Sequence, residues 1–210
     1  MKGKFITVEG IEGVGKSTNI EFIRSFLEAS ADKHVVVTRE PGGTPVGEEI
    51  RKLLLDHRYD GMSNDAELLL MFAARAEHLA QVILPALDNG YYILCDRFTD
   101  ATYAYQGGGR NIPFERIAML EDWVQGELRP HLTLLLDVPV ATGMQRAENR
   151  SQADRFELEQ HEFFEHVRNT YLSLAEREPE RIRIIDAAQS LEDVQSQIKN
   201  ELELFLAKYL

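Results

Sequence analysis

The sequence contains a single cysteine, Cys95, among its 210 residues. No disulfide can form within such a chain, and the apolar neighbours of Cys95 indicate a buried, unreactive thiol. Long hydrophobic runs are also missing, since none approaches the roughly 18 residues that a membrane-spanning helix needs. The first apolar run, Phe5 to Val8, is too short for the core of a signal peptide. We therefore expect a cytoplasmic protein with no membrane partner.

Positive charge is scarce as well. Lys and Arg together number 23 against 35 Asp and Glu, which gives a formal net charge of -12. Such a chain repels extended DNA or RNA unless its cations are concentrated in one place. We expect no nucleic acid polymer as a partner, whereas a small anionic ligand held by a local group of arginines is compatible with the charge.

The hydropathy pattern predicts strands that alternate with helices in a single domain over residues 1–210. Most of the apolar runs are continuous rather than alternating, as in strands covered on both faces. The expected strands are Phe5–Val8, His34–Thr38, Tyr91–Cys95, Leu132–Val138 and Ile182–Ile185. The expected helices are 16–29, 46–56, 64–88, 113–126, 140–149, 157–177 and 190–208, with Asn64 and Ser190 as N-caps. This order predicts an α/β fold, a doubly wound five-stranded parallel sheet with helices on both faces.

A phosphate-binding loop is the most specific local pattern. The stretch GIEGVGKS matches GxxxxGK[ST], directly after the first expected strand and at the start of the first helix. We assign ATP binding to all of it: Gly10, Ile11, Glu12, Gly13, Val14, Gly15, Lys16 and Ser17. Lys16 supplies charge to the outer phosphates, and the Ser17 hydroxyl can bind Mg²⁺. The fold is therefore expected to be of the P-loop NTPase type.

A second ligand for Mg²⁺ is expected where a strand ends in a carboxylate. Asp96 ends the third expected strand, and Asp137 lies near the end of the fourth. Spacing alone favours neither, but Arg97 directly follows Asp96 and supplies the cation that a phosphate acceptor needs. The predicted metal site is Ser17 with Asp96, and the predicted cofactor is Mg²⁺.

Arginines recur near the expected strand ends, at positions 39, 51, 75, 97, 110, 146, 150 and 155. Each one alone is best interpreted as solvated surface charge. Together, in so acidic a chain, they suit a protein that holds two phosphorylated ligands.

Four further segments resemble a known family. TREPGGT at 38–44, FAAR at 72–75, DRF at 96–98 and AYQGGGR at 104–110 are similar to thymidylate kinases in order and spacing, over essentially the whole chain. The resemblance implies transfer of the γ-phosphoryl group of ATP to dTMP, which gives dTDP and ADP with Mg²⁺. It also implies a homodimer, for which the long helix expected at 64–87 is the candidate interface.

The resemblance also implies roles for the acceptor site. Lys16 and Arg97 would be catalytic, with Arg97 gripping the acceptor phosphate and Arg39 assisting; Arg51 would join the substrate-binding residues. Glu12 would accept a hydrogen bond from the 3′-hydroxyl group of the sugar. These roles all place charged side chains around one bound monophosphate.

The base and sugar would be recognised by a second group of residues. Arg75 would read thymine with polar help from Thr102 and Gln106, while Tyr105 would crowd the 2′ position and favour deoxyribose. Phe72, three residues before Arg75, is the candidate for stacking on the base. Many family members carry the aromatic ring four residues before the arginine, where this chain has Met71, and a core position for Phe72 fits the periodicity equally well.

Residues 149–156 form an expected lid. Some family members carry an arginine within the phosphate loop, where this chain has Gly13. Charge on the transferred group would then be stabilised by Arg150, the third predicted catalytic residue, when the lid closes over ATP. Arg146 and Arg155 are weaker candidates because each could instead pair with neighbouring acids as surface charge.

Three other functions compete with this interpretation. Another P-loop nucleoside or nucleotide kinase would take a different acceptor, but it would lack the FAAR and AYQG segments. A regulatory GTP-binding switch would need a guanine-reading segment such as NKxD, which this sequence does not contain. A protein that keeps ATP only for stability gives no reason for the arginines of the acceptor site and lid.

Overall fold

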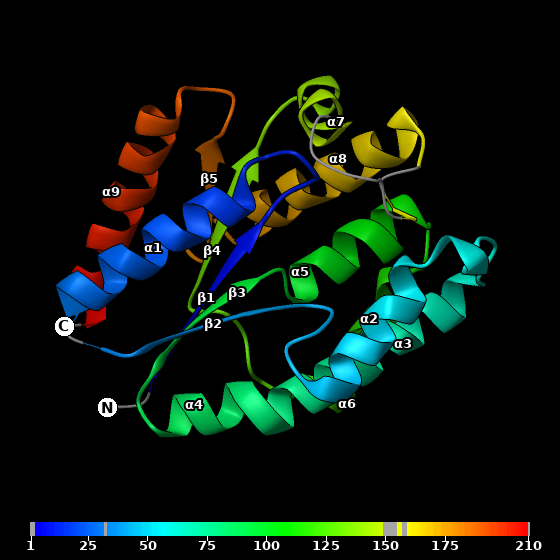
Figure 1. The fold of residues 1–210 in the computed structure, drawn as a ribbon, viewed down its shortest axis with the longest axis horizontal. Coiled ribbons are helices and arrows are strands. Elements are labelled where there is room, and N and C mark those ends of the chain that lie inside the picture. The colour runs from blue at the N-terminus through cyan, green and yellow to red at the C-terminus, as the bar shows by residue number, and fades with distance from the viewer. Residues whose placement is uncertain (1–2, 32, 149–154, 157–158, 210) are drawn as a thin grey trace.

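The computed structural model describes residues 3–31, 33–148, 155–156 and 159–209. Its strands form one parallel sheet in the order β2-β3-β1-β4-β5, with β1 in the centre (Figure 1). The strands are β1 (Lys4–Glu9), β2 (Val35–Arg39), β3 (Tyr92–Asp96), β4 (Leu132–Asp137) and β5 (Ile182–Asp186). The predicted doubly wound five-stranded parallel sheet is confirmed.

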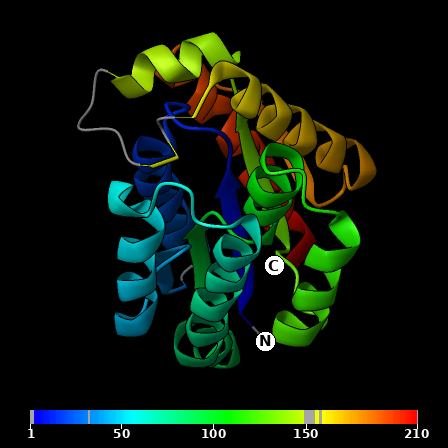
Figure 2. The same ribbon diagram turned by 90° about the vertical axis from the view of Figure 1, so that its right-hand side faces the viewer.

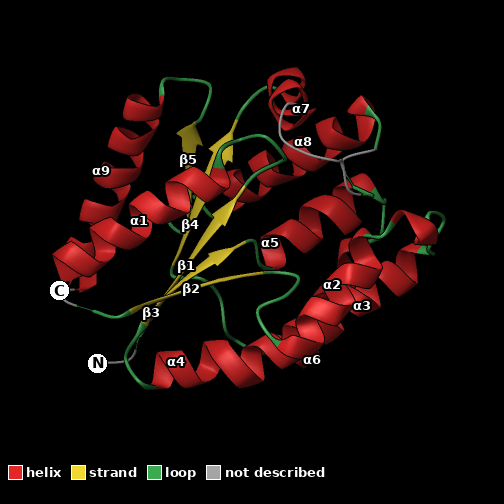
Figure 3. Cartoon of the chain, in the orientation of Figure 1, coloured by secondary structure: helices red, strands yellow, loops and turns green. Residues whose placement is uncertain are grey.

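Helices surround this sheet on both faces (Figures 2 and 3). The α-helices are α1 (Lys16–Ala31), α2 (Pro45–Leu55), α3 (Asn64–His78), α4 (Leu84–Asp88), α5 (Thr99–Thr102), α6 (Phe114–Gln125), α7 (Val140–Glu148), α8 (His161–Arg177) and α9 (Leu191–Tyr209). The described residues also form three helical segments of other types: η1 (His57–Tyr59), η2 (Leu79–Ile83) and η3 (Tyr103–Gly109), of which η2 and η3 are π-helical.

Alternating side chains of β1 show how the two faces are covered. Ile6 and Val8 are buried in a cluster with residues of α1 and α9. Phe5 points to the opposite face, where it packs with residues of η2 and α4. Because successive side chains of a strand point to opposite faces, α1 and α9 cover one face and α4 the other. The carboxyl end of β1 leads into the phosphate loop at the centre of the sheet.

One helical stretch, α5 with η3, was not expected from the sequence. No helix was expected between 64–88 and 113–126, and that expectation is wrong, because α5 lies in this interval and the glycines at 107–109 belong to η3. A Cβ atom at Gly108 would lie 2.1 Å from Thr170 Oγ1, and one at Gly109 would lie 2.4 Å from the ring of Phe163. Glycine is therefore needed here for the close approach of α8 and not for a turn.

Residues 64–88 form a continuous helical stretch made of α3, η2 and α4. Its N-cap is Ser63, whose side chain accepts from the Ala66 amide, and not Asn64 as expected; the Ser190 cap is confirmed by its bond from the Asp193 amide. By length and composition alone, 64–88 is long and apolar enough to cross a membrane, a test that core helices also pass. It carries the buried polar residues Arg75 and His78, which belong to the site described next.

Candidate active site

The phosphate loop joins β1 to α1 and has the backbone shape that its glycines permit. Gly10, Gly13 and Gly15 have φ values of 132°, 75° and 92°, in the region that side chains disfavour. A Cβ atom at Gly13 would also lie 1.9 Å from the carbonyl oxygen of Gly143. The side chains of Ile11 and Val14 are buried in the core. The loop is thus held from behind by apolar packing, with its backbone curled at the start of α1.

Lys16 is the first residue of α1, and its side chain folds back over the loop. Its Nζ donates to the carbonyl oxygens of Gly10 and Ile11 at 3.1 and 2.9 Å. Burial, with a contribution from the charge of Arg97, lowers the pKa of Lys16 to about 8. An anion bound in the loop would compensate this cost, so the ammonium group is placed to bind phosphate.

The structure separates the two candidate metal-binding carboxylates. Both oxygens of Asp137 accept hydrogen bonds from Arg168, at 2.7 and 2.8 Å. Asp96 instead has a buried oxygen, Oδ1, with no hydrogen-bond partner among the described residues. Asp96 and Ser17 both line the cavity beside the loop. Carboxylate and hydroxyl oxygens are ligands that suit Mg²⁺, so this pair fits the metal and Asp137 does not.

A cluster of three residues, one of them Glu12 of the phosphate loop, lines this cavity. Arg97 Nη2 donates to Glu12 Oε1 at 2.9 Å, and the Tyr105 hydroxyl donates to both Glu12 oxygens at 2.8 and 2.7 Å. The guanidinium carbon of Arg97 lies 4.8 Å from the centre of the Tyr105 ring. Arg97 has a φ of 68°, a left-handed conformation that is strained for any residue but glycine. The backbone at Arg97 is therefore strained in the conformation that directs its side chain into the cavity.

Glu9 and Tyr171 support this cluster from the core and were missed by the sequence analysis. Glu9 accepts from the Phe98 amide and from the Tyr171 hydroxyl, both at 2.7 Å, and Arg97 Nη1 donates to the same hydroxyl at 3.3 Å. Burial, reinforced by the nearby charge of Asp100, raises the pKa of Glu9 to about 8. A carboxyl residue at the end of an apolar strand was the available signal, but its partners lie far away in the sequence.

A second arginine lies deeper in the cavity. Arg75, on α3, is 2% exposed, and it bonds to Glu40 through Nε at 2.8 Å and to Thr102 through Nη2 at 3.0 Å. Its Nη1 has no hydrogen-bond partner in the described part of the chain. Its guanidinium carbon lies 4.7 Å from the centre of the Phe72 ring and 5.0 Å from that of Phe98. A buried donor remains available for a ligand.

One cavity, of about 220 Å³, joins these parts. The residues that line it include Glu12, Gly13, Gly15, Lys16, Ser17, Arg51, Arg75, Asp96, Arg97, Thr102, Tyr105 and Gln106. Phosphate-loop groups, an oxygen pair suited to Mg²⁺ and two arginines thus face a common space, as a transfer between two phosphorylated ligands requires.

Comparison with known proteins identifies the family. The family model for thymidylate kinase matches residues 8–198. The chain belongs to the thymidylate kinase family. It is 60% identical to the thymidylate kinase of Pseudomonas syringae pv. tomato, over 94% of each chain, and 55% identical to that of Nitrosospira multiformis, over 99% of this chain and 100% of the relative. The crystal structure of thymidylate kinase from Ehrlichia chaffeensis superposes with a TM-score of 0.78 at 32% identity, covering 97% of this chain and 99% of the other.

The stacking role expected for Phe72 in a thymidylate kinase is not supported by its position. Phe72 is 2% exposed and packs in a core cluster with Leu68 and Ile117, whereas Met71 lines the cavity. Phe72 does share a helix face with Arg75, as the three-residue spacing predicts, but the longer arginine lies over its ring and reaches the cavity instead. Phe72 therefore lies beneath Arg75 as a supporting surface.

Two more substrate-binding candidates differ in position. Arg51 lines the cavity and donates to the Pro41 carbonyl oxygen at 2.9 Å. Arg39 is half-exposed, pairs with Glu48 at 2.8 Å and lies in a neighbouring hollow that shares Asp96 with the cavity. The structure therefore does not bring Arg39 into the main cavity as expected.

The structure describes two of the three candidate lid arginines, Arg146 and Arg155. Residues 149–154, including Arg150, lie outside the described residues. Arg155 is 6% exposed and donates to Glu67 Oε2 at 2.6 Å, so its interpretation as surface charge is wrong. Arg146 donates to the carbonyl oxygen of Ala187 at 3.0 Å. Neither Arg146 nor Arg155 lines the cavity.

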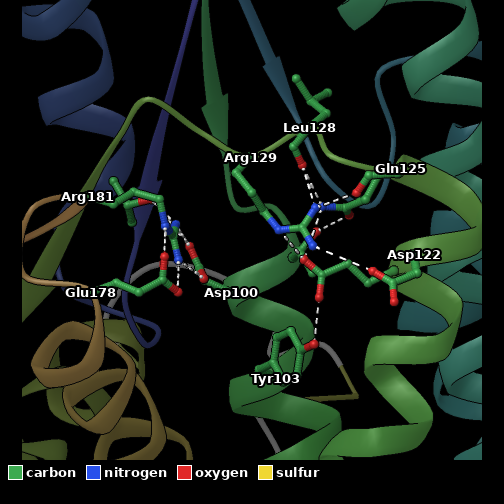
Figure 4. A network of polar contacts seen from close by, with 12 residues as sticks. Asp100, Tyr103, Asp122, Gln125, Leu128, Arg129, Glu178 and Arg181 are labelled. Carbon is green, nitrogen blue, oxygen red and sulfur yellow. Dashed lines mark hydrogen bonds and ion pairs between the residues drawn. The ribbon is translucent and has the colours of Figure 1, made fainter.

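A network of ion pairs holds the helix that carries several acceptor-site residues (Figure 4). Asp100, on α5, accepts from Arg181 at 2.7 and 2.9 Å. One turn further, the Tyr103 hydroxyl donates to Glu121, which also pairs with Arg129 at 2.7 Å. These contacts join α5 and η3 to α6 and to the segment before β5. They fix the position from which Thr102, Tyr105 and Gln106 reach the cavity.

Proposed function

We propose that this protein transfers the γ-phosphoryl group of ATP to dTMP, forming dTDP and ADP. The observation that carries the proposal is the single cavity that phosphate-loop residues share with Arg97 and with the unpartnered Nη1 of Arg75. A donor loop and an acceptor pocket in one space suit direct transfer between two bound nucleotides. Membership of the thymidylate kinase family supports dTMP as the acceptor.

Each charged residue then has a distinct task. Lys16 binds the outer phosphates of ATP, and Arg97 grips the acceptor phosphate with a planar, doubly donating guanidinium. Glu12 accepts from the 3′-hydroxyl of the sugar, and the Tyr105 ring crowds its 2′ position. Ser17 and Asp96 would hold Mg²⁺, which supplies neutralising charge between the β- and γ-phosphates when bound.

Stabilisation of the transferred group is proposed to come from Arg150. No side chain fits at Gly13, because its Cβ atom would lie 1.9 Å from the Gly143 carbonyl oxygen, so the phosphate loop itself cannot supply an arginine there. An arginine that reaches the γ-phosphoryl group is worth about 10³ to 10⁵ in rate in P-loop enzymes. Arg150→Ala should lower kcat by orders of magnitude and leave the affinity for dTMP nearly unchanged; a near wild-type kcat would contradict this role.

A coupled assay of ADP release with a panel of monophosphates tests the reaction. We expect a strong preference for dTMP over dCMP, dGMP and AMP, because mismatched polar groups leave buried partners unpaired. dUMP should be a weaker substrate than dTMP, because the missing methyl group removes only a small apolar contribution. Equal turnover of a purine monophosphate would contradict the assignment.

We further propose a cytoplasmic homodimer. The buried, unpaired Cys95 suits a reducing compartment. The expected interface helix, 64–87, exposes Leu69, and α6, which packs on α3, exposes Met119 and Trp123 at 67% and 82%. Exposed apolar side chains at i and i+4 suit association between copies. Sedimentation at micromolar concentration should give twice the 24.0 kDa mass of the chain, and a species of 24.0 kDa would contradict the dimer.

A further inference from the structure

A buried chain of hydrogen bonds lies behind Arg75. Glu40 accepts from Arg75 Nε through Oε2 at 2.8 Å, and its other oxygen, Oε1, lies 2.9 Å from His78 Nδ1. The second ring nitrogen of His78, Nε2, lies 2.6 Å from the Thr38 hydroxyl. The chain therefore runs from the end of β2, through the ring of His78, to the carboxylate that holds the arginine.

The chemistry of each group fixes the direction of these bonds. An ionised carboxylate only accepts, so His78 Nδ1 carries the proton and donates to Glu40. In the neutral imidazole, Nε2 is then the acceptor for the Thr38 hydroxyl. His78 is 0% exposed and Glu40 is 5% exposed, so water does not replace either partner. A buried hydrogen bond of this kind holds its groups in place, because leaving either one unpaired is costly.

His78 itself does not line the cavity, whereas Glu40 and Arg75 do. Its position three residues after Arg75 puts the two side chains on one face of α3, with Glu40 bonded to both. A Cβ atom at Gly43 would lie 2.7 Å from the His78 ring, so the loop after Glu40 closes tightly over it. His78 can therefore act on a ligand only through Glu40.

We propose that His78 is a positioning residue for acceptor-base selectivity: through Glu40 it holds the Arg75 guanidinium so that Nη1 stays available as a fixed hydrogen-bond donor in the cavity. This inference rests on the proposed function. Thymine presents a carbonyl oxygen at position 4, which accepts, where cytosine presents an amino group, which donates. A fixed donor at Nη1 can bond to the carbonyl oxygen of thymine, but it meets another donor in the amino group of cytosine. An arginine free to turn away discriminates less.

Two variants of the same residue test this. His78→Asn places an amide nitrogen close to the position of Nδ1, so it keeps a donor to Glu40. His78→Gln places its amide near Nε2 and keeps only the contact to Thr38. We expect His78→Gln to lower the ratio of kcat/KM for dTMP to that for dCMP about tenfold. The change should come mainly through KM for dTMP, with KM for ATP within about twofold. His78→Asn should retain most of the wild-type ratio of kcat/KM for dTMP to that for dCMP.

His34→Gln serves as the control, because His34 is exposed and stacks edge-on against Tyr91, away from the cavity. It should leave the ratio unchanged. The proposal is overturned if His78→Gln slows both monophosphates equally, since a purely structural role predicts that result, or if His78→Asn and His78→Gln behave alike. If His78→Gln does not fold, Thr38→Val decides: an unchanged ratio in that variant overturns the proposal. Failure of wild-type protein to phosphorylate dTMP would instead overturn the proposed function.

Discussion

The strained arginine of the active site permits a prediction that separates activity from stability. Arg97 has a φ of 68° and directs its guanidinium toward Glu12 and the cavity. Replacing it by Gly or by Ala removes the same guanidinium. Only glycine also removes the backbone strain, so the two variants should be equally inactive and unequally stable.

The magnitudes follow from the contacts. A doubly donating arginine on a phosphate makes two charge-assisted hydrogen bonds of about 1.5–3 kcal/mol each, so kcat/KM for dTMP should fall by about 10² to 10⁴ in both variants. A left-handed conformation costs a residue other than glycine about 1–2 kcal/mol, and the more flexible unfolded chain of the glycine variant offsets about 0.4–1 kcal/mol of that. Arg97→Gly should therefore be more stable than Arg97→Ala by about 0.8 kcal/mol from the middle of these ranges, and by at most about 1.6 kcal/mol. Each kcal/mol corresponds to about 2–4 °C in Tm for a chain of this size.

Steady-state kinetics and thermal unfolding of the two purified variants provide the test. A glycine variant that is less stable than the alanine variant would refute the assignment of strain to position 97. A loss of kcat/KM smaller than tenfold would refute the role of Arg97 as the grip on the acceptor phosphate.

Three further predictions concern pH and packing. The pKa of Lys16 is lowered to about 8, so the side chain loses its charge as pH rises through that value. The Kd of a non-hydrolysable ATP analogue should therefore increase between about pH 7 and about pH 9 in the wild-type protein. It should not increase in Lys16→Arg, because arginine stays charged over this range. The pKa of Glu9 is raised from 4.5 to about 8, so between these two pH values the folded protein binds more protons than the unfolded chain. The free energy of unfolding should therefore fall as pH rises through this interval, by at most about 1.4 kcal/mol per pH unit. Urea titrations of the wild-type protein and of Glu9→Gln measure this difference. Gly108→Ala should lose about 1–3 kcal/mol of stability, because its Cβ atom would meet Thr170 Oγ1 at 2.1 Å, and adding Thr170→Ala should recover part of that loss.

Sequence patterns sufficed wherever the chemistry is local. The phosphate loop is read from consecutive residues, and its glycines take the positive φ angles that the pattern implies. Continuous apolar runs located the strands, because strands of a parallel sheet are covered on both faces. The choice of Asp96 over Asp137 rested on Arg97 as its neighbour, and the structure supports it by pairing Asp137 with Arg168.

Contacts between distant segments could not be predicted in the same way. Nothing near Glu9 in the sequence indicates that its partners are the Phe98 amide and Tyr171. Helical spacing placed Phe72 and Arg75 on one face correctly, but it does not tell which side chain reaches past the other. The expected helices omitted 107–109, because the need for glycine there arises from the close approach of α8, which is distant in the sequence.

Competition between acceptors tests whether dTMP is the preferred phosphoryl acceptor of this protein. The protein is incubated with labelled ATP, Mg²⁺ and an equimolar mixture of dTMP, dUMP, dCMP, dGMP and AMP, and the labelled products are separated. We expect label mainly in dTDP, with dUDP a minor product. Arg75→Ala should lose this preference while its affinity for ATP is retained. Label distributed evenly over the products, or found mainly in a purine diphosphate, would contradict dTMP as the preferred acceptor.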